Sequence, residues 1–232
     1  MANMRSLMGP LESTYPANLR PLRDAPPLHC RGELLSADAR SVAVVGTRSP
    51  SRKGLAQARR LASRLARADV TVVSGLARGI DTAAHEAGLD AGGRTIAVLG
   101  CGIDDVYPAE NRALADRIAL RGALISQLPA RTPPSAQALR ARNALIAGIA
   151  QATVVIEAGS TSGARIAARW TLALGRPLFL TELVAAEAWA AHLLSRPGVH
   201  LLGGDRLEAL LAAAADESTR LLQLPLPLAA PG

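Results

Sequence analysis

The segment from Ser74 to Asp81, with the sequence SGLARGID, combines residue types that can bind an anion. It follows the β-branched run Val70–Val73, and this order predicts a strand, a tight loop and the start of a helix. Backbone N–H groups and the positive end of a helix dipole meet at such a loop. Arg78 adds a guanidinium with bidentate reach, and Asp81 is placed to cap the helix. The segment therefore predicts a phosphate-binding loop.

Three further strands are expected to end in small or hydroxyl residues. The loops after them are Gly46–Ser51 (GTRSPS), Gly100–Asp104 (GCGID) and Glu157–Gly163 (EAGSTSG). One such loop alone fits an ordinary turn between a strand and a helix, whereas four at one end of a sheet favour a shared anion-binding groove. The candidate phosphate contacts from these loops are Gly46, Thr47, Arg48, Ser49, Ser74, Gly75, Arg78, Gly79, Ser160, Ser162 and Gly163.

Further positive charge lies on the helices expected beside these loops. Arg140, Arg142 and Asn143 are at the start of an apolar helix expected over 136–149, where a guanidinium binds a phosphate and an amide orients it. A solvated helix end is the alternative for this group. Arg165 and Arg169, four residues apart, either extend the basic face or lie in solvent.

Residues suited to catalysis are scarce. His85 lies four residues after Asp81, within reach along one helix, but no nucleophile or metal ligand accompanies it. We interpret His85 as structural or ligand-orienting, and Asp104 and Asp105 as loop-capping residues. Neither Gly-x-Gly-x-x-Gly with a following acidic residue nor a Walker A pattern occurs. We therefore expect a binding protein without catalytic residues, metal ligands or a cofactor.

The elements that must position these residues alternate along the chain. Strands are expected over 42–45, 71–73, 95–99, 123–125, 153–156, 177–180 and 199–202. Helices are expected over 55–68, from 81, over 111–121, 136–149, 162–174, 185–194 and 205–215. This order predicts an α/β fold with a doubly wound, mostly parallel sheet and helices on both faces, whose ligands bind at the carboxyl ends of the strands. Residues 1–40 form a Pro/Arg-rich lead-in with a short strand near 28–30, residues 41–216 form the domain, and residues 217–232 form a Pro-rich tail.

Composition narrows the class of protein. The net charge of +7 favours a polyanionic partner such as nucleic acid, although arginine on solvated faces is the alternative source of that charge. Aromatic residues make up only 2% of the chain, which argues against many bases stacking on rings. Cys30 and Cys101 lack metal-ligand spacing, and no apolar run reaches membrane-spanning length. We expect a cytoplasmic protein that does not enter a membrane.

The loops, taken in order, resemble the DprA/Smf family of DNA-processing proteins. The resemblance covers about residues 15–180 and is carried by the ordered set VVGTR (44–48), VSGLARGID (73–81) with Ala84-His85, TIAVLG (95–100), Gly102-Ile103-Asp104, Tyr107-Pro108, Asn111, Arg142-Asn143, Ile146–Gly148, Glu157-Ala158 and Ser162-Gly163. It implies an extended Rossmann-like domain that binds single-stranded DNA in a basic pocket. It also implies roles in natural transformation and recombination, with relief of the block by single-strand-binding protein, loading of the RecA recombinase, and assembly as a homodimer.

The resemblance also assigns residues. It places the family's pocket arginine at Arg48, its glycine-rich loop at Gly75–Gly79 and its Arg-Asn motif at Arg142 and Asn143; Arg112 lies where the family tends to be basic. Departures are Leu139 and Arg140 in place of a Phe-Pro pair, Ala144 in place of a second arginine, and Gln127 in place of a glutamate. From its length, we also expect the chain to lack the small N-terminal helical domain and the C-terminal winged-helix-like domain that many members carry. DNA binding is therefore the firmer expectation, and strand loading the weaker one.

Two other functions remain open from the sequence. One is a nucleotide-binding or phosphoribohydrolase-like enzyme of a related Rossmann-like family, in which glutamates follow a Pro-Gly-Gly-x-Gly-Thr loop and act at the ribose. The matching helix start here, Ala164–Ala167, carries no carboxylate, which argues against hydrolysis. The other is a small-nucleotide sensor or partner module, which predicts tight binding of a mononucleotide and weak binding of a long oligonucleotide.

Overall fold

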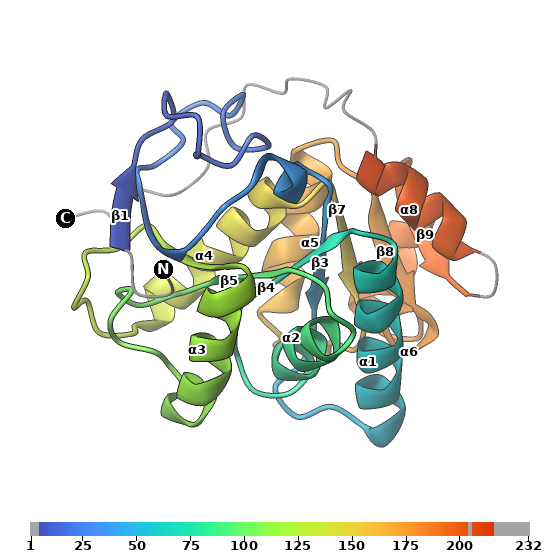
Figure 1. Cartoon of the computed structure of the whole chain (residues 1–232). Coiled ribbons are helices and arrows are strands. Elements are labelled where there is room, and N and C mark those ends of the chain that lie inside the picture. Colours follow the sequence, from blue (N-terminus) through green and yellow to red (C-terminus); the bar gives the residue numbers. More distant parts are fainter. Residues whose placement is uncertain (1–4, 204–205, 216–232) are drawn as a thin grey trace.

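The structure is a computed structural model of the whole chain, and it describes residues 5–203 and 206–215 (Figure 1). Within these residues the strands form one nine-stranded sheet in the order β1-β2-β6-β5-β4-β3-β7-β8-β9. Strands β3 to β9 are parallel to one another, whereas β2 pairs antiparallel with β6 and with β1 at one edge. The strands are β1 (Arg5–Met8), β2 (Leu28–Gly32), β3 (Ser41–Val45), β4 (Thr71–Ser74), β5 (Thr95–Val98), β6 (Ala123–Ser126), β7 (Ala152–Val155), β8 (Leu178–Thr181) and β9 (Val199–Leu202).

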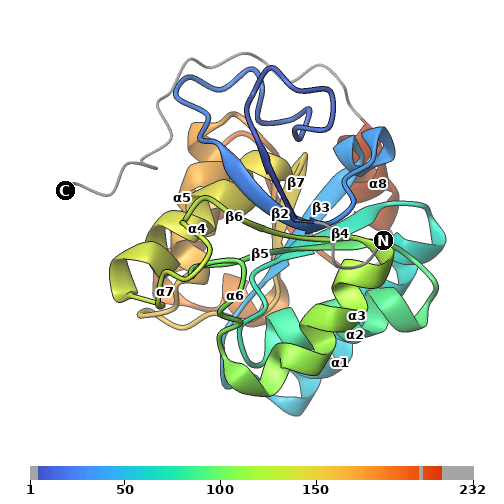
Figure 2. The ribbon, with the colours of Figure 1, turned by 60° about the vertical axis from the view of Figure 1, so that its left-hand side comes forward.

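Helices cover both faces of the sheet (Figure 2). They are α1 (Arg52–Arg67), α2 (Ile80–Asp90), α3 (Arg112–Arg121), α4 (Ala136–Ile149), α5 (Ala164–Ala173), α6 (Glu182–Ala185), α7 (Ala188–Ala191) and α8 (Leu207–Ala215). Because successive strand residues point to opposite faces, Val44 packs in one core with Leu65 of α1, whereas Val45 packs in another with Leu145 of α4. This arrangement confirms the predicted doubly wound α/β fold.

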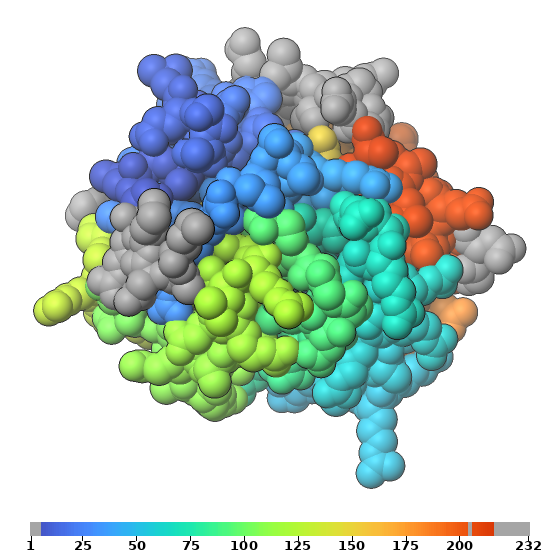
Figure 3. Space-filling model, viewed as in Figure 1, coloured from blue at the N-terminus to red at the C-terminus, as the bar shows by residue number. Residues whose placement is uncertain are grey.

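The residues before β3 belong to the same body as the sheet. Strand β2 lies where a short strand was expected, and β1, which has no clear sequence pattern, pairs with it. In the chain segment that connects β1 to β2, the Asn18 side chain donates to the carbonyl oxygen of Ile149 at 2.6 Å. The backbone carbonyl oxygen of Asn18 accepts a hydrogen bond from Arg176 at 2.8 Å. In the space-filling view the N-terminal residues share one continuous surface with α2 and α3 (Figure 3). The expected tail at 217–232 lies outside the described residues.

Two expected helices differ in the structure. The helix expected over 185–194 is broken into α6, α7 and a 3-10 turn over His192–Ser195, because Glu187 adopts an extended backbone with ψ of 133°. Helix α2 begins at Ile80 after Gly79, whose φ is +79°, so Asp81 lies inside the first turn and is not the N-cap. None of the helices in the described part of the chain is long and apolar enough to cross a bilayer.

Candidate functional site

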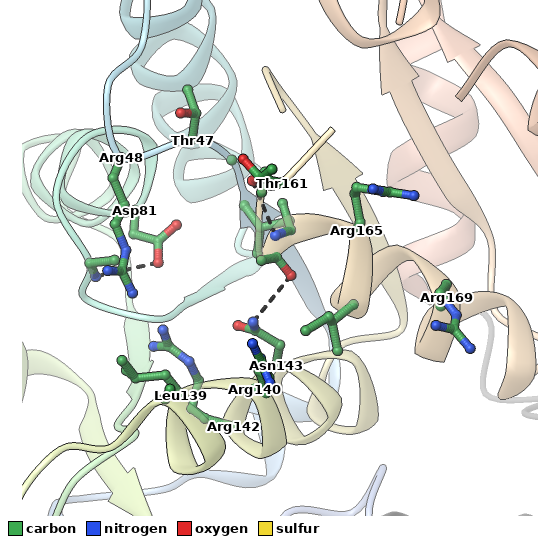
Figure 4. A pocket seen from close by; sticks show the side chains of 18 of the residues that line it. Thr47, Arg48, Asp81, Leu139, Arg140, Arg142, Asn143, Thr161, Arg165 and Arg169 are labelled. Carbon is green, nitrogen blue, oxygen red and sulfur yellow. Dashed lines mark hydrogen bonds between the residues drawn. The ribbon is translucent and has the colours of Figure 1, made fainter. Parts of the chain in front are cut away.

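A pocket of about 670 Å³ opens at the carboxyl ends of β3 and β7 (Figure 4). From β3 the chain proceeds to β4, β5 and β6 on one side, and it returns through α4 to β7 on the other side. Such a reversal of strand order leaves a crevice, which is where open α/β sheets bind ligands. The walls come from the loop after β3, the loop after β7, and the N-terminal halves of α4 and α5.

Positive charge dominates the lining of this pocket. Figure 4 shows Arg48 on one side, Arg140 and Arg142 on α4, and Arg165 and Arg169 on α5. Against these five guanidiniums, the described lining residues supply one carboxylate, that of Asp81. Within the described part of the chain, Arg48, Arg140, Arg165 and Arg169 take part in no salt bridge. The pocket is therefore suited to a ligand with several negative charges.

Arg142 supports the site from beneath. Its side chain is buried, and Nη1 donates to the carbonyl oxygens of Val98, at 2.7 Å, and of Gly75. Burial lowers the pKa of Arg142, Asp81 opposes this effect, and the charge of Arg48 adds to it. A Cβ atom at Gly75 would lie 1.9 Å from Nη1, so only glycine leaves room for the guanidinium. Arg142 thus joins α4 to the loops after β4 and β5.

The loop after β4 is folded around Asp81. The carboxylate accepts hydrogen bonds from the backbone N–H groups of Gly75, at 3.1 Å, and Ala77, at 3.3 Å. Its pKa is raised mainly by burial, an effect that Arg142 opposes. The expectation that these amide groups face an external phosphate is therefore corrected, because a carboxylate of the chain itself already binds them. Asp81 caps this loop instead of the helix.

The other predicted residues of this loop are also engaged. Arg78 donates to Glu110 through Nε, at 2.7 Å, and through Nη2, at 2.8 Å. Ser74 is fully buried, and its hydroxyl donates to the carbonyl oxygen of Val44 at 2.6 Å. At Gly79, a Cβ would lie 2.5 Å from the carbonyl oxygen of Thr47. Ser74 and Gly79 thus shape the loop, while Arg78 lies outside the lining of the main pocket.

Glu157 secures the loop after β3, a role that the sequence did not reveal. Its carboxylate accepts from the backbone N–H of Ser51, at 3.0 Å, and from the Ser51 hydroxyl, at 2.9 Å. The same hydroxyl accepts from the N–H of Gly54, at 3.0 Å, and so caps α1. The Thr47 N–H donates to the Glu157 carbonyl at 2.7 Å. A carboxylate therefore also occupies the start of α1, and the loop holds Arg48 at the edge of the pocket.

The loop after β7 forms the opposite wall. Ser160, Ser162 and Gly163 line the pocket, and Asn143 donates to the Gly163 carbonyl at 3.1 Å. Arg165 donates to the Ser160 carbonyl and lies over the Trp189 ring, 5.3 Å from its centroid. Arg165 and Trp189 were not among the predicted site residues, although the spacing of Arg165 and Arg169 indicates a shared helix face.

The remaining predicted residues divide between the pocket and its surroundings. Gly46 and Thr47 line the pocket, and Ser49 is exposed beside it, with its N–H donating to the Thr47 hydroxyl at 3.2 Å. Arg112 is exposed at the start of α3 and does not line it. His85 is fully buried, with Nδ1 2.5 Å from the Thr95 hydroxyl, and mainly burial lowers its pKa to about 3. This position fits the structural interpretation of His85.

The family model and the similar curated proteins point to one family. The family model described as DNA recombination-mediator protein A matches residues 6–197. A putative DNA processing protein DprA from Mycobacterium tuberculosis is 44% identical over 165 residues, which are 70% of this chain and 42% of that protein. The chain thus spans less than half the length of this relative.

Two solved structures share the fold. DNA processing protein A from Streptococcus pneumoniae is 34% identical with a TM-score of 0.76, and the match covers 88% of this chain and 73% of that one. DNA processing protein A from Helicobacter pylori, described for its single-stranded DNA binding mode, is 25% identical with a TM-score of 0.78, and the match covers 92% and 96% of the two chains.

Proposed function

The chain belongs to the DNA recombination-mediator protein A family, also called DprA/Smf, and from this premise we propose that it binds single-stranded DNA in the arginine-lined pocket. The positive charge of that pocket is the observation that supports this proposal most strongly. Four arginines without a carboxylate partner in the described residues line it, and the one carboxylate among its described lining residues already accepts hydrogen bonds from two amides. Contacts to phosphates supply most of the affinity of sequence-independent DNA binding.

The dimensions of the pocket favour a single strand. A volume of about 670 Å³ is within the range of small-molecule sites, so the pocket admits a nucleotide unit of a flexible strand. The Helicobacter relative described for single-stranded DNA binding supports this choice. The contacts we assign are Gly46, Thr47, Arg48, Arg140, Asn143, Ser160, Ser162 and Gly163, with Arg165 and Arg169 added.

The proposed activity is binding and not catalysis. The first turn of α5 starts Ala164-Arg165-Ile166-Ala167, so it presents guanidinium where a ribose-cleaving enzyme of related fold needs a carboxylate. We extend the proposal to the cellular role of the family: the chain, as a homodimer, protects incoming strands in natural transformation, relieves the block by single-strand-binding protein and assists RecA loading. The relatives named as DNA processing proteins support this role.

Fluorescence anisotropy with three competitors tests the proposal. A labelled single-stranded oligonucleotide is titrated with the protein, and unlabelled single strand, duplex of equal length and mononucleotide then compete for it. We expect the single strand to compete best, with little dependence on sequence and a steep fall in affinity as salt rises. A mononucleotide that competes as well as the oligonucleotide would favour a nucleotide sensor, and release of free base from it would show an enzyme.

A further inference from the structure

A second, smaller hollow continues from the arginine-lined pocket toward the loop after β5. Residues lining this hollow are Gly75, Arg78, Tyr107 and Pro108, together with Arg48, Ala77, Leu139 and Arg142. The last four of these residues also line the main pocket. Because the two hollows share these four residues, they adjoin at Arg48, and Tyr107 lies next to the arginine-lined pocket.

The two hollows differ in whether their arginines are paired with a carboxylate. Arg48 and Arg140 in the main pocket lack a carboxylate partner among the described residues, whereas Arg78 in the smaller hollow is bound by Glu110 through two hydrogen bonds. The smaller hollow also contains the ring of Tyr107 and the apolar side chains of Pro108 and Leu139, beside the guanidiniums of Arg48 and Arg142 that it shares with the main pocket. Phosphates therefore favour the main pocket. The smaller hollow is shallow, with a volume of about 10 Å³, so a flat group at this position lies over the exposed Tyr107 ring and not inside the hollow.

Tyr107 offers an aromatic surface that the other rings do not. Its exposed fraction is 42%, whereas Tyr15 and Phe179 are exposed by 2% and 1%. Trp170 and Trp189 are half-buried and packed against the core, and Arg165 lies over the Trp189 ring. These five residues are all the aromatic residues of the chain. An exposed ring beside a cationic groove is the arrangement on which bases of a single strand stack.

We propose that Tyr107 is a stacking platform for a nucleobase of the strand whose phosphates lie in the arginine-lined pocket. The inference rests on the proposed function and adds to it a base-binding subsite. Arg48 lines both hollows, so it holds the phosphate that joins the two nucleotides on either side. Stacking on a ring requires no particular base, so the subsite adds affinity without sequence preference.

An abasic strand separates this contact from the phosphate contacts. Wild type, Tyr107→Ala and Tyr107→Phe are titrated with a single-stranded oligonucleotide and with an abasic oligonucleotide of the same length and charge. We expect Tyr107→Ala to weaken binding of the normal strand about five-fold or more, as loss of one base–aromatic stack does, and to leave binding of the abasic strand unchanged. Tyr107→Phe keeps the ring and should bind both strands like wild type. Thermal unfolding shows that each variant is folded.

These titrations distinguish a failure of the stacking platform from a failure of the proposed function. An equal loss on both strands would show a phosphate or folding effect of Tyr107 and would overturn the stacking platform, as would no loss on either. A loss in Tyr107→Phe as large as in Tyr107→Ala would assign the contact to the hydroxyl and would also overturn it. Wild-type protein that binds neither strand would contradict the proposed function itself, and the subsite with it.

Discussion

The carboxylate of Asp81 accepts a hydrogen bond from the backbone N–H of Gly75, six residues earlier, at 3.1 Å. A second hydrogen bond from Ala77, at 3.3 Å, closes the same loop. The glycine-rich loop after β4 is therefore organised around an internal anion. Affinity for an external phosphate must come mainly from guanidinium side chains around the pocket.

Replacing Asp81 should destabilise the loop. In Asp81→Ala, the buried amide group of Gly75 and the partly buried amide group of Ala77 lose their acceptor, and loss of an acceptor by a buried donor costs about 1–3 kcal/mol. Asp81→Asn is the matched control, because its side-chain oxygen can still accept hydrogen bonds from these two amide groups. We expect urea unfolding to give a free energy of unfolding lower for Asp81→Ala than for Asp81→Asn by that amount. Equal stability of the two variants would show that the carboxylate does not hold the loop.

Gly75→Ala should displace Arg142. The added methyl group would lie 1.9 Å from Nη1 and would break its hydrogen bonds to the carbonyls of Gly75 and Val98. Overpacking of this kind costs about 1–3 kcal/mol, so the midpoint of urea unfolding should fall. Gly159→Ala is the control, since nothing lies within 4 Å of a Cβ there. A Gly75→Ala variant as stable as Gly159→Ala would contradict the tight packing of Arg142.

His85 should make stability depend on pH. Its pKa falls from 6.5 to about 3 on folding, mainly through burial and further through the charge of Arg142. At a pH between these two pKa values, His85 binds a proton in the unfolded chain but not in the folded chain. The free energy of unfolding therefore falls as the pH drops below 6.5. The slope from this residue is about 1.4 kcal/mol per pH unit.

Two measurements check this prediction. Urea unfolding of His85→Gln between pH 7 and 5 should show a pH slope smaller than that of wild type, and the difference should approach this amount below about pH 6. An NMR titration of wild type should show a neutral His85 ring down to pH 4. Protonation of the ring near pH 6.5 in the folded protein would contradict the prediction.

Much of the fold could be predicted from the sequence because the β-branched runs and small-residue loops alternate regularly. The parallel strands, the two-sided helix cover and the loops that meet at one end all follow from that pattern. Strand β1 could not be predicted, since its pairing with β2 depends on tertiary contacts that the sequence of residues 5–8 does not display. The break at Glu187 was missed for the same reason.

The candidate site was predicted in its location more accurately than in its chemistry. Residue types alone do not show that a carboxylate six positions away will bind the amides of Gly75, or that Glu157 will reach Ser51 from another loop. They also do not show that Arg142 is buried and Arg140 is exposed, although the two are neighbours on one helix. These differences arise from side-chain packing across the sheet.

Arg78 should contribute less to DNA binding than Arg48 does. Glu110 already accepts two hydrogen bonds from Arg78, at 2.7 and 2.8 Å, and this pair is exposed on the surface. We expect Arg78→Ala to weaken binding of a single-stranded oligonucleotide less than Arg48→Ala does, in anisotropy titrations at one salt concentration. The reverse order would mean that the strand displaces Glu110.

The salt dependence of DNA binding by Arg48→Ala tests the central claim most directly. The logarithm of the affinity for a single-stranded oligonucleotide is measured against the logarithm of salt concentration for wild type, Arg48→Ala and Arg59→Ala. Arg59 is exposed on α1 and does not line the pocket. Arg59→Ala therefore changes the net charge of the protein as Arg48→Ala does, but leaves the pocket unchanged. If Arg48 holds a phosphate, its variant binds every sequence more weakly and its slope falls by about 0.7, while Arg59→Ala matches wild type. Equal slopes and affinities for Arg48→Ala and Arg59→Ala would contradict binding of the strand in this pocket.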